Sequence, residues 1–87
     1  MDDLVKTMQA DLAEEIADCM KYLQLATKAE EGGMELEPLY FEMMAYDEYT
    51  HARFLLGVLD SLGAEVPDDV RGKFWRAYEE VDARKCG

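Results

Sequence analysis

The stretch Met44–Ala52, which reads MAYDEYTHA, places Glu48 and His51 three residues apart in a segment with a helical pattern. Residues at this spacing lie side by side on one face of a helix. At about 100° per residue, the same face carries a stripe of apolar or amphipathic residues: Tyr40, Phe41, Met44, Leu55, Val58, Leu59 and Leu62. The pattern therefore predicts an acid and an imidazole inside a buried stripe.

A carboxylate in a buried stripe needs a positive partner. Burying a carboxylate without one costs several kcal/mol, and no other residue of this stripe carries a charge at neutral pH. A metal ion held by Glu48 and His51 is the leading explanation. The alternative is a core histidine that hydrogen-bonds Glu48 or a tyrosine.

The preceding part of the chain predicts one long helix over residues 3–31, followed at once by Gly32 and Gly33. Glu15 falls inside the apolar stripe of this helix, whereas Lys21 and Lys28 fall on the opposite face, where they are poorly placed to pair with it. The stripe has the three- and four-residue spacing of a helix that faces a core, and consists of Leu4, Met8, Leu12, Ile16, Cys19, Leu23 and Ala26. We expect Cys19 to pack there as a small hydrophobe.

Residues 32–37 form the only flexible connector between the two long patterns, and Pro38 suits the first turn of a second helix over residues 38–62. Gly63 is a natural left-handed cap. A connector this short predicts an antiparallel hairpin. A shorter third helix is expected over residues 68–84, with a weaker apolar face that packs on the hairpin or on a neighbouring subunit: Val70, Phe74, Ala77, Tyr78 and Val81.

The fold class expected is all-α, as a single domain over residues 1–87. Glu15 and Glu48 each lie near the middle of their helices, so the hairpin would bring Glu15, Glu48 and His51 to one level. The carboxylate-bridged two-metal site of a four-helix bundle needs twice this set. We therefore expect a two-fold homodimer that completes a four-helix bundle. Pairing would also support so small a domain, which buries only about 60% of its unfolded surface.

Two carboxylates and one imidazole per chain are hard oxygen and borderline nitrogen donors, which suit iron(II), manganese or zinc. Three interpretations stay open from the residues alone. The site holds redox-active iron, or it holds manganese or zinc without redox activity. In the third, the chain is a non-enzymatic dimeric helical interaction module, in which Glu15, Glu48 and His51 form a buried hydrogen-bond network.

Composition excludes several classes of function. The net charge of -11, from 20 acidic and 9 basic residues, argues against a nucleic-acid partner. No apolar run approaches the roughly 20 residues of a membrane span, and the start of the chain lacks the basic region of a signal peptide. Cys19 and Cys86 form no Cys-x-x-Cys pair, which argues against a structural zinc site and a disulfide scaffold. We expect a cytoplasmic setting, without a membrane partner.

Two motifs together resemble the ferritin-like superfamily. Glu15 and Tyr22 give Glu-x6-Tyr, and Glu48 and His51 give Glu-x-x-His on the next helix. More narrowly, Asp47–Ala52, which reads DEYTHA, is similar to the half-length, encapsulated ferritin-like proteins, a rubrerythrin-related group. The resemblance covers roughly residues 8–80.

The resemblance implies that Glu15, Glu48 and His51 are iron ligands and that Tyr22 hydrogen-bonds near the metal centre. It implies a di-iron ferroxidase site with two irons per dimer, acting in iron storage or detoxification, and assembly of the dimers into a decameric ring. It also implies a shell protein as partner and a place inside a protein nanocompartment, although this sequence ends at Gly87 without that group's apolar docking peptide. The lack of a four-cysteine electron-transfer domain favours a ferroxidase over a rubrerythrin-type peroxidase.

Overall fold

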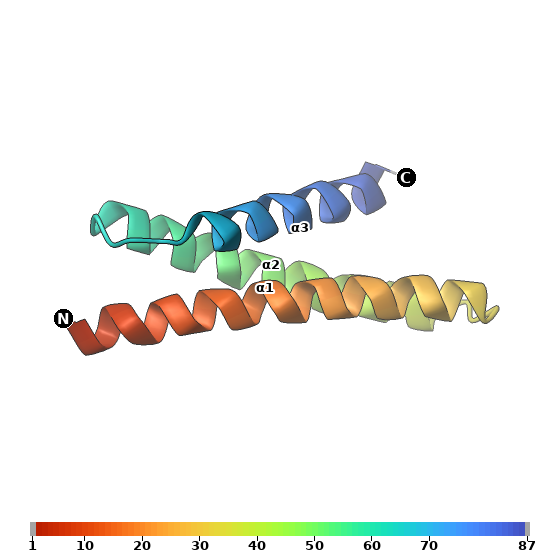
Figure 1. Ribbon diagram of the computed structural model, residues 1–87. Helices are drawn as coiled ribbons and strands as arrows, with labels where there is room; N and C mark the ends of the chain where they lie inside the picture. The colour runs from red at the N-terminus through yellow and green to blue at the C-terminus, as the bar shows by residue number, and fades with distance from the viewer. Residues whose placement is uncertain (1, 87) are drawn as a thin grey trace.

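The computed structural model describes residues 2–86, which form three helices and no strand: α1 (Asp2–Glu31), α2 (Glu37–Ser61) and α3 (Asp68–Cys86). Figure 1 shows α1 and α2 side by side as a long antiparallel hairpin, with α3 lying along it. The molecule is rod-like, with extents of 47 × 21 × 17 Å. The all-α class and the three helices are confirmed, and each helix ends within two residues of the prediction.

The turns between the helices depend on two glycines. Gly33 and Gly63 have φ angles of 81° and 69°, a region that residues with a Cβ rarely adopt. At the end of α2, the backbone N–H of Ala64 donates to the Leu59 carbonyl at 2.9 Å, which closes the helix. The left-handed cap predicted at Gly63 is therefore present, and Pro38 lies in the first turn of α2 as expected.

All three helices contribute to one hydrophobic core. The ring of Tyr49 stacks on that of Phe74 with centroids 5.6 Å apart, which packs α3 against the hairpin. Cys19 is fully buried, as predicted for a small hydrophobe. Burial of each large apolar side chain contributes about 1.5–3 kcal/mol. The core consists mainly of Leu12, Ile16, Cys19, Leu23, Ala45, Tyr49, Ala52, Leu56, Leu59, Val66, Phe74, Ala77 and Val81.

The prediction that the stripe around Glu48 and His51 is buried holds only in part for the single chain: Leu59 is fully buried and Leu55 packs against the core, but other members are exposed. Tyr40 and Met44 are 62% and 40% exposed. The prediction failed because α2 carries apolar residues on several faces, so periodicity alone did not decide which face meets α1 and α3. Leu62, Leu4 and Tyr78, also expected on inward faces, are exposed too. Apart from Leu59, which belongs to the predicted stripe, the residues that α2 buries lie on the neighbouring side of the helix: Pro38, Ala45, Tyr49, Ala52 and Leu56.

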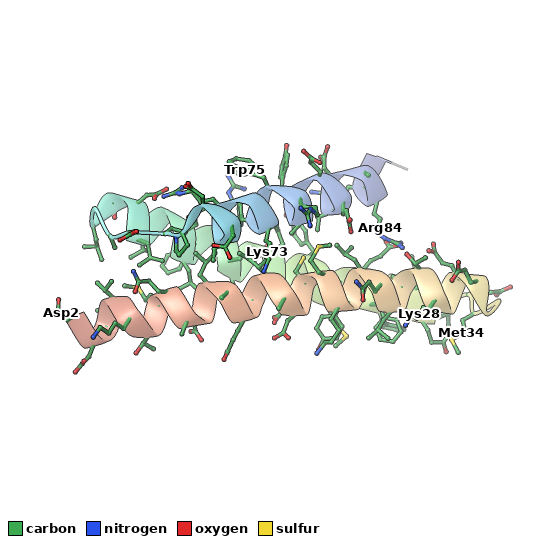
Figure 2. All side chains as sticks on the ribbon, viewed as in Figure 1. Asp2, Lys28, Met34, Lys73, Trp75 and Arg84 are labelled. Carbon is green, nitrogen blue, oxygen red and sulfur yellow. The ribbon has the colours of Figure 1, made fainter. Side chains whose placement is uncertain are left out.

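Arg84 joins the end of α3 to both other helices through hydrogen bonds (Figure 2). Its guanidinium donates to Glu42 Oε1 at 2.7 Å, to Thr27 Oγ1 at 2.7 Å and to Glu30 Oε1 at 3.0 Å. These contacts explain why α3 continues to Cys86, two residues beyond its predicted end. Among residues 2–86, no helix combines the length and the apolar character needed to cross a bilayer.

We expect Arg84→Leu to lower the free energy of unfolding by about 1–3 kcal/mol, because two carboxylates and a hydroxyl lose a charged donor. Chemical denaturation followed by circular dichroism would measure this loss. Arg76→Leu on the exposed surface of the same helix is the matched control, with an expected change within about 0.5 kcal/mol. Equal losses in the two variants would show that the Arg84 contacts do not stabilise the fold.

Candidate metal centre

Three side chains predicted from the sequence to share a site meet at the middle of the hairpin. Glu15 comes from α1, and Glu48 and His51 come from successive turns of α2. One ligand atom from each lies within 4.8 Å of the other two. The antiparallel register therefore brings Glu15, Glu48 and His51 to one level.

His51 presents its Nδ1 atom to both acids. Nδ1 lies 3.3 Å from Glu15 Oε2 and 3.5 Å from Glu48 Oε1. When Nδ1 carries a proton, it donates to Glu15. When that proton leaves, the same nitrogen is free to bind a metal ion, and its lone pair already faces the two carboxylates.

The site is covered on one side and open on the other. The side chains of Glu15 and Glu48 are 22% and 21% exposed, whereas that of His51 is 58% exposed. Tyr40 and Met44, on the same side of α2, are exposed as well. We call this side of the hairpin the open face. It places two partly desolvated acids beneath an imidazole that solvent or another chain can reach.

The surroundings of Glu48 disfavour its ionisation. Partial burial, followed by the charge of Glu15 and a hydrogen bond with it, raises the pKa of Glu48, while His51 acts in the opposite direction. Two carboxylates this close are difficult to ionise together in the absence of a cation. A bound metal ion would remove this repulsion.

The donor set fits a metal ion. Ligand atoms about 2.1 Å from one ion lie at most about 4.2 Å from each other, so side-chain shifts of less than about 1 Å would close the group. Carboxylate oxygen and imidazole nitrogen suit iron, manganese and zinc. A single chain contributes three ligands.

Three further residues lie near the site, and one of them, Glu80, comes from a position with no obvious signal in the sequence. Cys19 lies behind Glu48, and burial, followed by the charges of Glu48 and Glu80, raises the pKa of its thiol to about 11. It is therefore a neutral thiol at physiological pH, and it is not part of the ligand group formed by Glu15, Glu48 and His51. The proximity of Glu80 depends on how α3 packs, which its sequence pattern does not specify. Asp18, one turn from Glu15, also raises the pKa of Glu48.

Tyr22 is not part of the cluster. It is half-buried, and the ammonium of Lys21 lies 4.7 Å from the centre of its ring. No hydrogen bond joins Tyr22 to Glu15, Glu48 or His51 within residues 2–86. Its seven-residue separation from Glu15 amounts to about 10 Å along the helix axis. A role for Tyr22 near the metal centre stays a prediction.

An antiparallel helical hairpin with a Glu on one helix and a Glu-x-x-His pair on the next defines the ferritin-like class of metal proteins. A family model described as Rubrerythrin matches residues 6–84, a span that includes most of all three helices. The chain therefore belongs to the rubrerythrin family, whose members bind iron. Neither the curated proteins nor the solved structures provide a match to this chain.

Without metal, we expect Glu48→Gln to raise the melting temperature at pH 7 by a few degrees. The fold raises the pKa of Glu48, so its contribution to stability is full below the unfolded-state pKa of about 4.3 and is lost as the pH rises through the folded-state pKa. The gain from the substitution should therefore shrink at pH 4.

Thermal melts in a chelator at pH 4 and pH 7 would test this pH dependence. Glu14→Gln, at the exposed neighbour of Glu15, removes the same charge away from the cluster and is the control. A Glu48→Gln variant that melts lower than the native chain at pH 7 would contradict the proposed repulsion.

Proposed function

We propose that two chains pair through their open faces, bind two iron ions between them and oxidise iron(II) with oxygen or peroxide, in iron storage or detoxification. The cluster of Glu15, Glu48 and His51 at the middle of the hairpin carries this proposal. The rubrerythrin family match supports it, because it places iron among the expected metals.

The ligand count supports a shared site. One chain offers half of the set that a carboxylate-bridged metal pair requires, and a two-fold axis beside His51 would supply the other half. The resulting four carboxylates would balance the charge of two divalent ions. Exposed Tyr40, Met44 and Leu62 share this side of α2, and pairing would remove their apolar surface from water.

The geometry suggests a role for each ligand. Glu48 and its two-fold mate would bridge the two ions, with Glu15 and the Nδ1 atom of His51 as terminal ligands on each. Iron(II) is the substrate, and a pair of ions supplies two electrons, one from each, to oxygen or peroxide. The chain would hold the ions together, and its carboxylates would shift between bridging and terminal binding as the charge changes.

Two other functions use the same residues. A site loaded with manganese or zinc would stabilise the pair without redox activity. An interaction module would use the cluster as a polar network, and the 3.3 Å contact between His51 Nδ1 and Glu15 Oε2 is compatible with this alternative. The decameric ring, shell protein and nanocompartment implied by the resemblance are further proposals.

The deciding experiment is a titration of metal-free protein with iron(II) under nitrogen, followed by exposure to air. We expect one iron per chain, two per dimer, and rapid oxidation seen as a rise in near-ultraviolet absorbance. His51→Ala should abolish both, because it removes the only nitrogen ligand. Glu14→Gln should leave both unchanged.

Sedimentation analysis of the same samples separates the alternatives. Metal binding with a stabilised dimer but no absorbance change in air would favour a manganese or zinc site. A dimer that forms regardless of metal and binds no iron would favour the interaction module. Full binding and oxidation in His51→Ala would reject the proposed site altogether.

A further inference from the structure

The outer side of α2 carries an apolar residue that the fold of one chain does not explain. Phe54 is 70% exposed, more than any other large hydrophobic residue described, and Met43 is exposed on the same side. Both belong to a stripe with three- and four-residue spacing, which we call the outer stripe. It consists of Met43, Asp47, Thr50, Phe54, Gly57 and Ser61.

The outer stripe is separate from both the core and the open face. At 100° per residue, it is centred roughly 110° around α2 from Glu48 and His51, and roughly opposite the buried stripe. Pairing through the open face would therefore leave Phe54 and Met43 in water. A contact other than the one through the open face would be needed to bury them.

Gly57 is a second unexplained residue on this side. It lies inside α2, where glycine costs about 0.5–1 kcal/mol relative to alanine, yet a Cβ at this position would meet no atom within 4 Å. Its φ angle is not positive. The fold of the single chain therefore has no need for glycine here. The missing side chain contributes to a hollow of about 530 Å³ lined by Thr50, Arg53, Phe54, Gly57, Val58 and Ser61.

A second groove, similar in volume to the hollow at Gly57, lies toward the other end of the outer stripe. Its volume is about 540 Å³. Leu39, Met43 and Tyr46 line it from α2 together with Val81 from α3, so its walls are mainly apolar. Asp47 and Lys85 stand at its edge, and the ammonium of Lys85 lies 4.7 Å from the centre of the Tyr46 ring.

We propose that the outer stripe binds the outer stripe of a second copy of this chain, antiparallel and about a two-fold axis at Thr50. Positions equally distant from Thr50 are complementary in size and chemistry. Met43 would face the hollow at Gly57 of the other copy, and Phe54 would enter the groove beside Tyr46. A two-fold axis makes each of these contacts twice.

The placement of two opposite charges, on Asp47 and Arg53, supports a second copy of this chain as the partner. At a net charge of -11, two chains repel each other unless opposite charges meet at the contact. Asp47 and Arg53 lie three residues on either side of Thr50, so each would face the other across the axis. Neither makes an ion pair with another residue in the described chain. The apolar contacts would supply most of the affinity, and the ion pairs would fix the register.

A charge exchange tests the register. We expect Asp47→Arg and Arg53→Asp each to weaken self-association at least about tenfold, because each places like charges opposite one another twice. The double variant should restore the native dissociation constant. Sedimentation velocity in a chelator, on a Glu48→Gln background, keeps metal binding out of the measurement. A double variant as weak as either single one would overturn the two-fold register.

A second pair of variants tests the apolar contacts. Gly57→Leu should raise the melting temperature of the single chain, because it removes a helix glycine, and yet weaken self-association at least about tenfold by filling the hollow. Phe54→Asp should weaken it to a similar extent. Leu36→Asp, at the exposed N-cap of α2, is the control: it should raise the melting temperature slightly as a better helix cap and leave self-association unchanged. Unchanged self-association in Gly57→Leu and Phe54→Asp would overturn the proposal.

Cross-linking locates the axis directly. On a Cys86→Ser background, Thr50→Cys would face its own symmetry mate, so mild oxidation should give a covalent dimer in high yield. Gln24→Cys, exposed on α1, should not. Equal yields from the two variants, or no self-association of the native chain in a chelator by sedimentation, would reject a contact centred on Thr50. Because none of these measurements involves iron, failure here leaves the proposed ferroxidase function untouched.

Discussion

The close approach of Glu15 and Glu48 across the hairpin is the constraint on which the rest of the structure depends. Two like charges next to each other in a partly desolvated position destabilise the chain unless a proton or a cation intervenes. Burial first, and then the charge of Glu15, accordingly raises the pKa of Glu48. The fold tolerates this cost because α1 and α2 are long and tightly packed. Ala45 and Ala52, both fully buried, let the helices approach closely at the level of the acids.

The third helix determines which side of the hairpin stays open. It packs on the side of Tyr49, where the ring stacks on Phe74, and Arg84 holds its far end. The same packing leaves His51 exposed. One helix, α2, thus serves three purposes on three sides: it builds the core, it carries two ligands of the candidate site, and it presents the outer stripe with Phe54.

Much of this architecture is readable in the sequence, for identifiable reasons. Helix lengths, the glycine cap at Gly63 and the grouping of Glu15, Glu48 and His51 follow from local patterns and from the register that a short connector imposes. The buried side of α2 does not, because an apolar residue such as Tyr40 satisfies the helical pattern as well as Tyr49 does. The Arg84 contacts also could not be predicted from the sequence. They join residues 42 to 57 positions apart, and one arginine on an exposed helix looks like any other.

The packing of α1 against α2 bears on how metal binding and assembly are related. In small metal domains whose ligands come together only when the ion binds, binding free energy is folding free energy. Here a hydrophobic core of buried side chains from all three helices holds α1 against α2, and this packing brings the three ligand atoms within 4.8 Å of one another. Metal binding should therefore add little to the folding free energy of one chain. In the proposed pair, its binding energy would act instead on the contact between chains, so iron would strengthen the dimer more than it stabilises either subunit.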